Sequence, residues 1–196
     1  MPRSFKSGVV CFLFAWLAFS PAARSLTLAE LRDDVAMTPE KLLHRFADFK
    51  FKLGEEIQAV DSFLAAKAGD CDDFATLAAS VLVEKGYTPK LIAVFMEREV
   101  HVVCYIVETK CYLDYNNRKH VTGGVTSDGT LADIAQKVAS SFRAPWSCAS
   151  EFSFKQGKRK TLWTEFRQTE APPRHAAPRV PHNEVPQIIA RASPRP

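Results

Sequence analysis

The spacing of apolar residues predicts a buried helix that begins at Cys71. Five apolar positions follow at i, i+3, i+4, i+7 and i+8, which places them on one face of an α-helix. They are Phe74, Leu77, Ala78, Val81 and Leu82. Gly86 ends the helix and Pro89 lies just beyond it, as is typical of a helix C-terminus. We expect this helix to pack along that stripe against the rest of the domain.

Four shorter or later helices are also predicted from capping signals and apolar spacing. Thr27 and Glu30 have the spacing of a capping box, and Pro39 suits the first turn of a second helix. The expected helices are residues 27–35, a helix opened by Thr38-Pro39-Glu40, a short helix capped by Asp61 or Ser62, and residues 131–142.

The middle of the chain changes to strand character. Three runs rich in β-branched and apolar residues follow one another with short links, which predicts an antiparallel meander. A final hairpin is expected around a Gly-containing turn. The predicted strands are residues 91–96, 100–107, 111–115, 151–154 and 161–166. Helices followed by an antiparallel sheet indicate an α+β domain.

The two ends of the chain differ from this middle part. Residues 1–25 begin with Arg3 and Lys6, continue with an apolar run too short to span a membrane, and end in small residues. This pattern predicts a signal peptide and a periplasmic or secreted protein with no membrane span after its removal. Residues 171–196 hold seven of the twelve prolines, which predicts a disordered tail. One folded domain, residues 26–170, remains.

Charge narrows the set of partners. The chain carries +4 in total, but each terminal segment, 1–25 and 171–196, carries +3, so residues 26–170 carry −2. A basic surface for nucleic acid is therefore not expected on the domain.

The chemistry that the sequence offers is a cysteine, a histidine and an aspartate, in that order. Cys71 begins a helix, where the unpaired amides and the helix dipole favour a thiolate. His101 lies in a predicted strand and Asp114 at the end of the next strand. These are the parts of a thiol nucleophile, its base, and the acid that orients the base.

Strand register decides whether the histidine meets the aspartate. If residues 108–110 form the link, Val107 faces Cys111 and Cys104 faces Asp114. Asp114 and His101 are then diagonal neighbours on opposite faces, and a shift of one residue or a bulge is needed to bring them together.

The sequence resembles the transglutaminase-like superfamily, and within it the bacterial transglutaminase-like cysteine proteinases, over roughly residues 45–120. The segments that carry the resemblance are Gly69-Asp70-Cys71-Asp72-Asp73-Phe74-Ala75, Gly86-Tyr87, His101-Val102-Val103 and Leu113-Asp114. The resemblance implies a papain/transglutaminase-like fold in which the nucleophile helix packs on an antiparallel sheet. It also implies a cysteine peptidase. The small size of the domain, with no obvious second domain, predicts an accessible cleft and a protein or peptide substrate.

By this resemblance Cys71 is the nucleophile, His101 the general base and Asp114 the orienting acid. Gln58 has the separation from the cysteine at which relatives place an oxyanion donor, and the Cys71 amide is the other candidate. Some adhesin-cleaving relatives bind calcium beside the cysteine. The acids at 70, 72 and 73 offer ligands for it, but capping and the helix dipole explain acids at a helix start. No metal or other cofactor is therefore expected.

Three alternatives to a hydrolase remain open at this point. An amine in place of water would make the protein a transglutaminase. A non-catalytic exported module would have its cysteines paired, since an oxidising compartment permits disulfides. Its four mature-chain cysteines allow three full pairings, and no Cys-x-x-Cys spacing indicates zinc. In the third alternative, the Pro/Arg-rich tail is the working part of an envelope adaptor.

Overall fold

The computed structural model describes residues 26–119, 124–155 and 158–168. The chain divides into two compact units, Met1–Phe166 and Arg167–Pro196, and the elements described below lie in the first. The predicted signal peptide (1–25) and proline-rich tail (171–196) lie outside the described residues.

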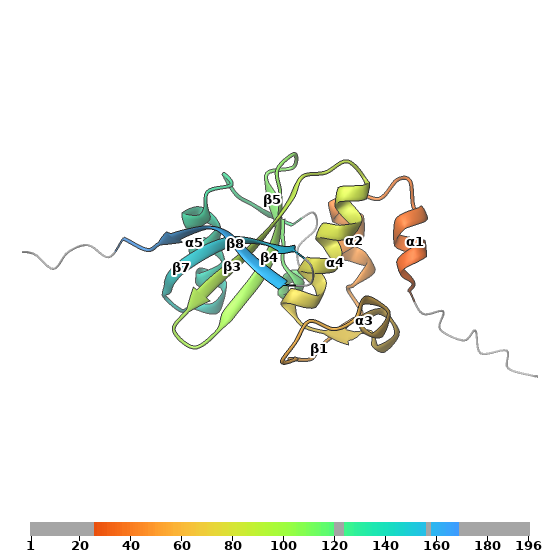
Figure 1. Ribbon diagram of the computed structural model, residues 1–196, viewed down its shortest axis with the longest axis horizontal. Coiled ribbons are helices and arrows are strands. Elements are labelled where there is room, and N and C mark those ends of the chain that lie inside the picture. The colour runs from red at the N-terminus through yellow and green to blue at the C-terminus, as the bar shows by residue number, and fades with distance from the viewer. Residues whose placement is uncertain (1–25, 120–123, 156–157, 169–196) are drawn as a thin grey trace, which may run out of the picture. The chain divides into compact units, whose positions relative to one another are not determined.

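A six-stranded antiparallel sheet with the order β6-β5-β4-β3-β7-β8 forms the middle of the unit (Figure 1). The strands are β3 (Pro89–Met96), β4 (Val100–Ile106), β5 (Cys111–Leu113), β6 (Val125–Thr126), β7 (Trp146–Lys155) and β8 (Lys158–Phe166). The predicted meander is β3-β4-β5, and the predicted hairpin is β7-β8. Both strands of the hairpin begin earlier than the sequence indicated.

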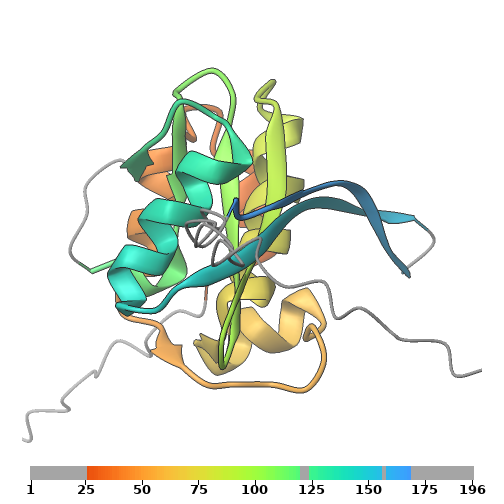
Figure 2. The same ribbon diagram turned by 90° about the vertical axis from the view of Figure 1, so that its left-hand side faces the viewer.

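Helices cover both faces of this sheet, with α4 on one side and α5 on the other (Figures 1 and 2). Helices α1, α2 and α3 pack on α4. The helices are α1 (Leu28–Asp33), α2 (Pro39–Arg45), α3 (Val60–Ala66), α4 (Cys71–Glu84) and α5 (Leu131–Phe142). A short parallel pair, β1 (Lys50–Phe51) and β2 (Ala68–Gly69), and a 3-10 turn, η1 (Tyr115–Asn117), complete the unit. The predicted α+β class is confirmed.

Alternation along the strands divides the core into two layers. In β4, Val102, Cys104 and Ile106 belong to the cluster that α4 closes. Val103 and Tyr105 belong to the cluster on the α5 side. Successive strand residues point to opposite faces, so one strand contributes to both layers. The five apolar positions predicted for α4 are all buried, which confirms the stripe.

Local capping follows the sequence in two helices and departs from it in a third. Thr27 and Glu30 form the predicted capping box of α1, and Thr38 caps α2. Helix α3 has Ala59 at its N-cap with no side-chain cap, so the predicted cap was wrong. Asp61 instead lies in the first turn, where its charge favours the positive end of the helix dipole.

The register of β4 on β5 differs by one residue from the predicted one. Ile106, rather than Val107, lies opposite Cys111. Residues 107–110 form a turn in which the Lys110 N–H donates to the Val107 carbonyl at 3.4 Å. Lys110 adopts φ 50° in this turn. Because the side-chain period of a strand is two, this single step exchanges the faces of the paired strand.

Candidate active site

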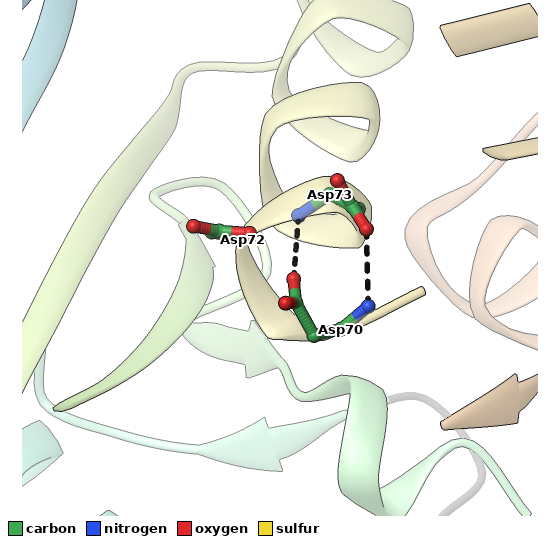
Figure 3. Close-up of side chains that lie close together, drawn as sticks. All are labelled: Asp70, Asp72 and Asp73. Carbon is green, nitrogen blue, oxygen red and sulfur yellow. Dashed lines mark hydrogen bonds between the residues drawn. The ribbon is translucent and has the colours of Figure 1, made fainter. Parts of the chain in front are cut away.

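Cys71 is the first residue of α4 and is held there by a reciprocal cap. Asp70 accepts a hydrogen bond from the Asp73 N–H at 3.4 Å, and Asp73 accepts one from the Asp70 N–H at 3.1 Å (Figure 3). The Cys71 thiol is free and half-buried. The Cys71 N–H, at the first helical position, has no acceptor within the helix.

Gln58 is tied to the start of α4 by Asp73. Its backbone N–H and its side-chain Nε2 donate to the two Asp73 carboxylate oxygens, each at 2.6 Å. Nε2 also donates to the Ala68 carbonyl at 3.3 Å. These contacts hold the loop before α3 against the nucleophile helix. They engage the amide group for which the sequence predicted oxyanion binding, so that role stays a prediction, as does that of the Cys71 N–H.

The one-residue shift in register brings Asp114 to the side of the sheet on which His101 lies. Cys104 pairs with Leu113, so the next step along the strands sets Asp114 against Val103, two residues from His101 and on its face. His101 Nε2 lies 2.9 Å from Asp114 Oδ1. Both side chains are buried, with 4% and 1% of their surface exposed.

Asp114 is held in place by the turn that follows it. It is the N-cap of η1, and its Oδ1 accepts a hydrogen bond from the Asn116 N–H at 2.8 Å. Its Oδ2 lies 3.5 Å from the side-chain nitrogen of Asn117. Asp114 is therefore both a turn former and the partner of the histidine.

The electrostatic setting of His101 favours its charged form. Burial lowers the pKa of His101, but hydrogen bonds to Asp114 and to Cys71, with the charges of both, outweigh burial and raise it to about 10. The ring of Phe142 in α5 packs 4.8 Å from the imidazole. The structure thus joins the sequence-predicted cysteine, histidine and aspartate in one chain of contacts, with the histidine in the middle.

The sequence offered Asp72 only as one of three acids that could ligate calcium, yet its carboxylate is the unusual one at this helix start. It points away from the pair formed by Asp70 and Asp73 (Figure 3). Its Oδ1 is buried and has no hydrogen-bond partner among the described residues. Burial, Asp70 and Asp73 raise the pKa of Asp72 to about 7. An oxygen from each of these three acids lies within 4.8 Å of the others.

A cavity of about 590 Å³ lies beside the first turns of α4. Asp72, next to Cys71 in the chain, lines it together with Glu55 and Glu56 on one side. Phe152 and Arg159 line it from the β7-β8 hairpin.

The cysteines of the described residues are not paired. Cys71, Cys104, Cys111 and Cys148 are all free thiols. Burial raises the pKa of the Cys104 thiol far above its usual value, which keeps it neutral and inert. The paired cysteines of the non-catalytic alternative are therefore not found among the described residues.

Three comparisons with known proteins bear on the chain. A family model described as Transglutaminase-like domain matches residues 31–139. Calcium-bound LapG of Legionella pneumophila is 16% identical, with a TM-score of 0.43 over 68% of this chain and 73% of that one. A proposed cysteine protease from Cytophaga hutchinsonii is 15% identical, with a TM-score of 0.35 over 74% and 51%. No curated protein sequence matches the chain.

Proposed function

The chain belongs to the transglutaminase-like family, and we propose that it is a cysteine peptidase or amidase of that family. The observation that carries the proposal is the position of His101, which is buried, lies 2.9 Å from Asp114 Oδ1, and is near enough to Cys71 for that thiol to help raise its pKa. A histidine shared by a thiol and a buried carboxylate is the arrangement that generates a thiolate and stores its proton.

In the proposed reaction the Cys71 sulfur attacks an amide carbonyl carbon, and His101 keeps the proton that the thiol has released. The tetrahedral oxyanion lies near the helix start, where the Cys71 N–H donates to it. As the carbon–nitrogen bond breaks, His101 gives its proton to the leaving amine, and a thioester remains. Water then attacks the thioester, His101 takes one proton from it, and that proton returns to the sulfur as the carboxylic acid leaves. Asp114 holds the ring and its charge throughout.

Alkylation of Cys71 by iodoacetamide tests the activated thiol, and Cys148 supplies a matched control in the same molecule. Cys148 is also free and half-buried, but it has no histidine partner among the described residues. A thiol with the ordinary pKa of ~8.5 is about 0.3% thiolate at pH 6. We expect Cys71 to be labelled at least about tenfold faster than Cys148 at pH 6, and His101→Ala to remove the difference. Equal rates in the native protein would contradict the proposal.

The acceptor of the acyl group needs its own test. Water is the proposed acceptor, and an amine in its place would make the protein a transglutaminase. Native protein incubated with casein and dansylcadaverine should release new N-termini that Cys71→Ala does not release. Dansyl label fixed to casein, without new N-termini, would favour acyl transfer to amines.

A calcium ion fits the start of α4 better than the sequence suggested. Asp70 and Asp73 are already engaged in capping, but the buried Asp72 Oδ1 has no partner, and three carboxylates at this spacing repel one another. Asp70, Asp72 and Asp73 would hold the ion through carboxylate oxygens, which are the ligands that calcium prefers, and its positive charge would offset the negative charge of the three carboxylates. Calcium should then raise the melting temperature of the native protein and not that of Asp72→Asn. If calcium shifts the melting temperature of neither protein, helix capping alone explains the three acids at the start of α4.

We also propose export to the periplasm or the medium, from the composition of residues 1–25. Among the described residues, no helix has the length and hydropathy of a membrane span. The N-terminus of the protein recovered outside the cytoplasm should lie between Ala22 and Leu26. A mature protein that starts at Met1 would contradict export by cleavage.

A further inference from the structure

A second cavity, of about 370 Å³, lies between α4 and the β7-β8 hairpin. Three large apolar side chains on its walls are exposed to solvent, Val83 at 59%, Phe154 at 37% and Leu162 at 51%. An apolar surface of this kind, gathered around a hollow, marks an interaction site more often than single exposed side chains do.

The two cavities adjoin each other. Thr76, Phe152 and Phe154 line both of them. The first cavity also includes Asp72, which directly follows the proposed nucleophile, and the second extends along α4 to Val83, three turns further. We treat them together as one groove, the α4 groove, which starts at Asp72, the residue after Cys71, and runs along the helix to Val83.

The walls of the α4 groove change character along its length. Glu55 and Glu56 make the end at the start of α4 acidic, and Arg159 is the one cation among the described residues that line it. The Arg159 guanidinium lies 4.0 Å over the ring of Phe152. The far end is apolar. The two charged groups that line it, Lys90 and Glu151, pair with each other at 3.1 Å. An occupant that complements both ends is basic near the thiol and apolar away from it.

We propose that the α4 groove binds an extended polypeptide segment, with a basic side chain at the Cys71 end and an aliphatic or aromatic side chain against Val83, Phe154 and Leu162. The inference rests on the proposed function in treating this segment as part of the substrate. Its length, one helix face of several turns, suits a strand-like peptide rather than a small molecule. Selectivity for the substrate sequence then comes from the α4 groove and not from Cys71, His101 and Asp114.

The first test is selection of a phage-displayed random dodecapeptide library on the full mature chain carrying Cys71→Ala, which binds without turning over. We expect enriched peptides to carry a basic residue followed or preceded by an apolar residue several positions away. One enriched peptide, made with a fluorophore, then gives dissociation constants for variants by polarisation. Leu162→Asp places a charge in the apolar end and should weaken binding at least about tenfold.

Trp163→Asp is the matched control. Trp163 is the next residue on β8, is 66% exposed, and lines neither cavity, so the same charge change there should leave binding unchanged. Glu56→Gln should weaken binding of the basic peptide and reduce its salt dependence. Because Leu162 and Trp163 are both exposed, neither variant is expected to unfold the domain, and thermal melts check this.

Three results would overturn the proposal. These are no enrichment from the library, binding that Leu162→Asp and Trp163→Asp weaken equally, or a dimer that Leu162→Asp dissociates, which would assign the groove to a second copy of the chain. The alkylation test of Cys71 against Cys148 is independent of these outcomes. If the thiol is activated but no peptide binds, the proposed function stands and the proposal for the α4 groove is wrong. If a peptide binds but the thiol is not activated, the groove proposal stands, the proposed function is wrong, and the protein is a binding module.

Discussion

The buried pair of His101 and Asp114 makes folding stability depend on pH in a defined direction. His101 has its pKa raised from 6.5 to about 10 in the folded protein, so the folded state holds this proton more tightly than the unfolded chain does. The stabilisation is therefore fully present below pH 6.5 and is lost as the pH rises through about 10. Native protein should become less stable across this window.

The size of the effect follows from the same shift. A pKa difference of one corresponds to about 1.4 kcal/mol, so a rise from 6.5 to about 10 corresponds to about 5 kcal/mol. This is a net value, in which burial opposes the charged imidazole and both of its partners, Asp114 and Cys71, favour it. A Cys71→Ala background removes one partner and should give a smaller change over the same range. His101→Gln removes the titrating group and should remove the difference altogether.

Urea unfolding followed by tryptophan fluorescence at intervals from pH 6 to 9.5 measures this contribution. The quantity of interest is the difference in free energy of unfolding between the native protein and His101→Gln, since other groups titrate in both. His44→Gln is the control, because His44 is exposed on α2. We expect the advantage of the native protein over His101→Gln to fall with rising pH, and His44→Gln to follow the native curve. Parallel curves for native protein and His101→Gln would refute the reasoning.

Three further predictions concern the start of α4. A Cβ at Gly69 would lie 2.4 Å from Asp73 Oδ2 and 2.6 Å from the buried Phe63 ring, so Gly69→Ala should lower the unfolding free energy by about 1–3 kcal/mol in urea titrations. A native-like midpoint would show that the two side chains can yield. Asp73 accepts hydrogen bonds from Gln58 and Asp70, so Asp73→Asn sets an NH2 group against these donors and should lower the free energy of unfolding by about 3 kcal/mol, measured by thermal melts. The control Asp61→Asn, at an exposed position, should lower it by about 0.3–1 kcal/mol. Equal losses would contradict the hydrogen-bond network around Asp73. The buried Thr76 Oγ1 has no partner among the described residues, so Thr76→Val should raise stability by about 1 kcal/mol, and a loss would reveal a partner for the hydroxyl.

The helices were predictable because their signals are local. Residues 131–142 were expected as a helix, and α5 has those bounds. The capping box of Thr27 and Glu30 also formed as predicted. Both depend on contacts between residues three or four apart, which the sequence places side by side wherever a helix forms. The cap of α3 was missed because Ala59 carries no capping side chain that a reader of the sequence could find.

Contacts between distant parts of the chain were harder to predict from the sequence. The sequence paired Val107 with Cys111, and a turn over residues 107–110 moved the pairing by one. The residue types at positions 107–110 did not predict that turn. The role of Gln58 shows the same limit, because its partner Asp73 lies 15 residues away and is reached only after the intervening loop and α3 have folded.

By itself, the sequence determined the parts of this protein: its helices, its meander, its α+β class and the residue types of the candidate site, Cys71, His101 and Asp114. Only the tertiary structure decided how those parts meet. The register put Asp114 on the face of His101, the loop before α3 took Gln58 to Asp73, and the hairpin closed a groove over α4. The physical reason is the separation along the chain over which each kind of interaction acts. Helix periodicity and capping are set by neighbours along the chain, whereas a one-residue step in a turn, which costs little locally, reverses which side chains face each other across the sheet.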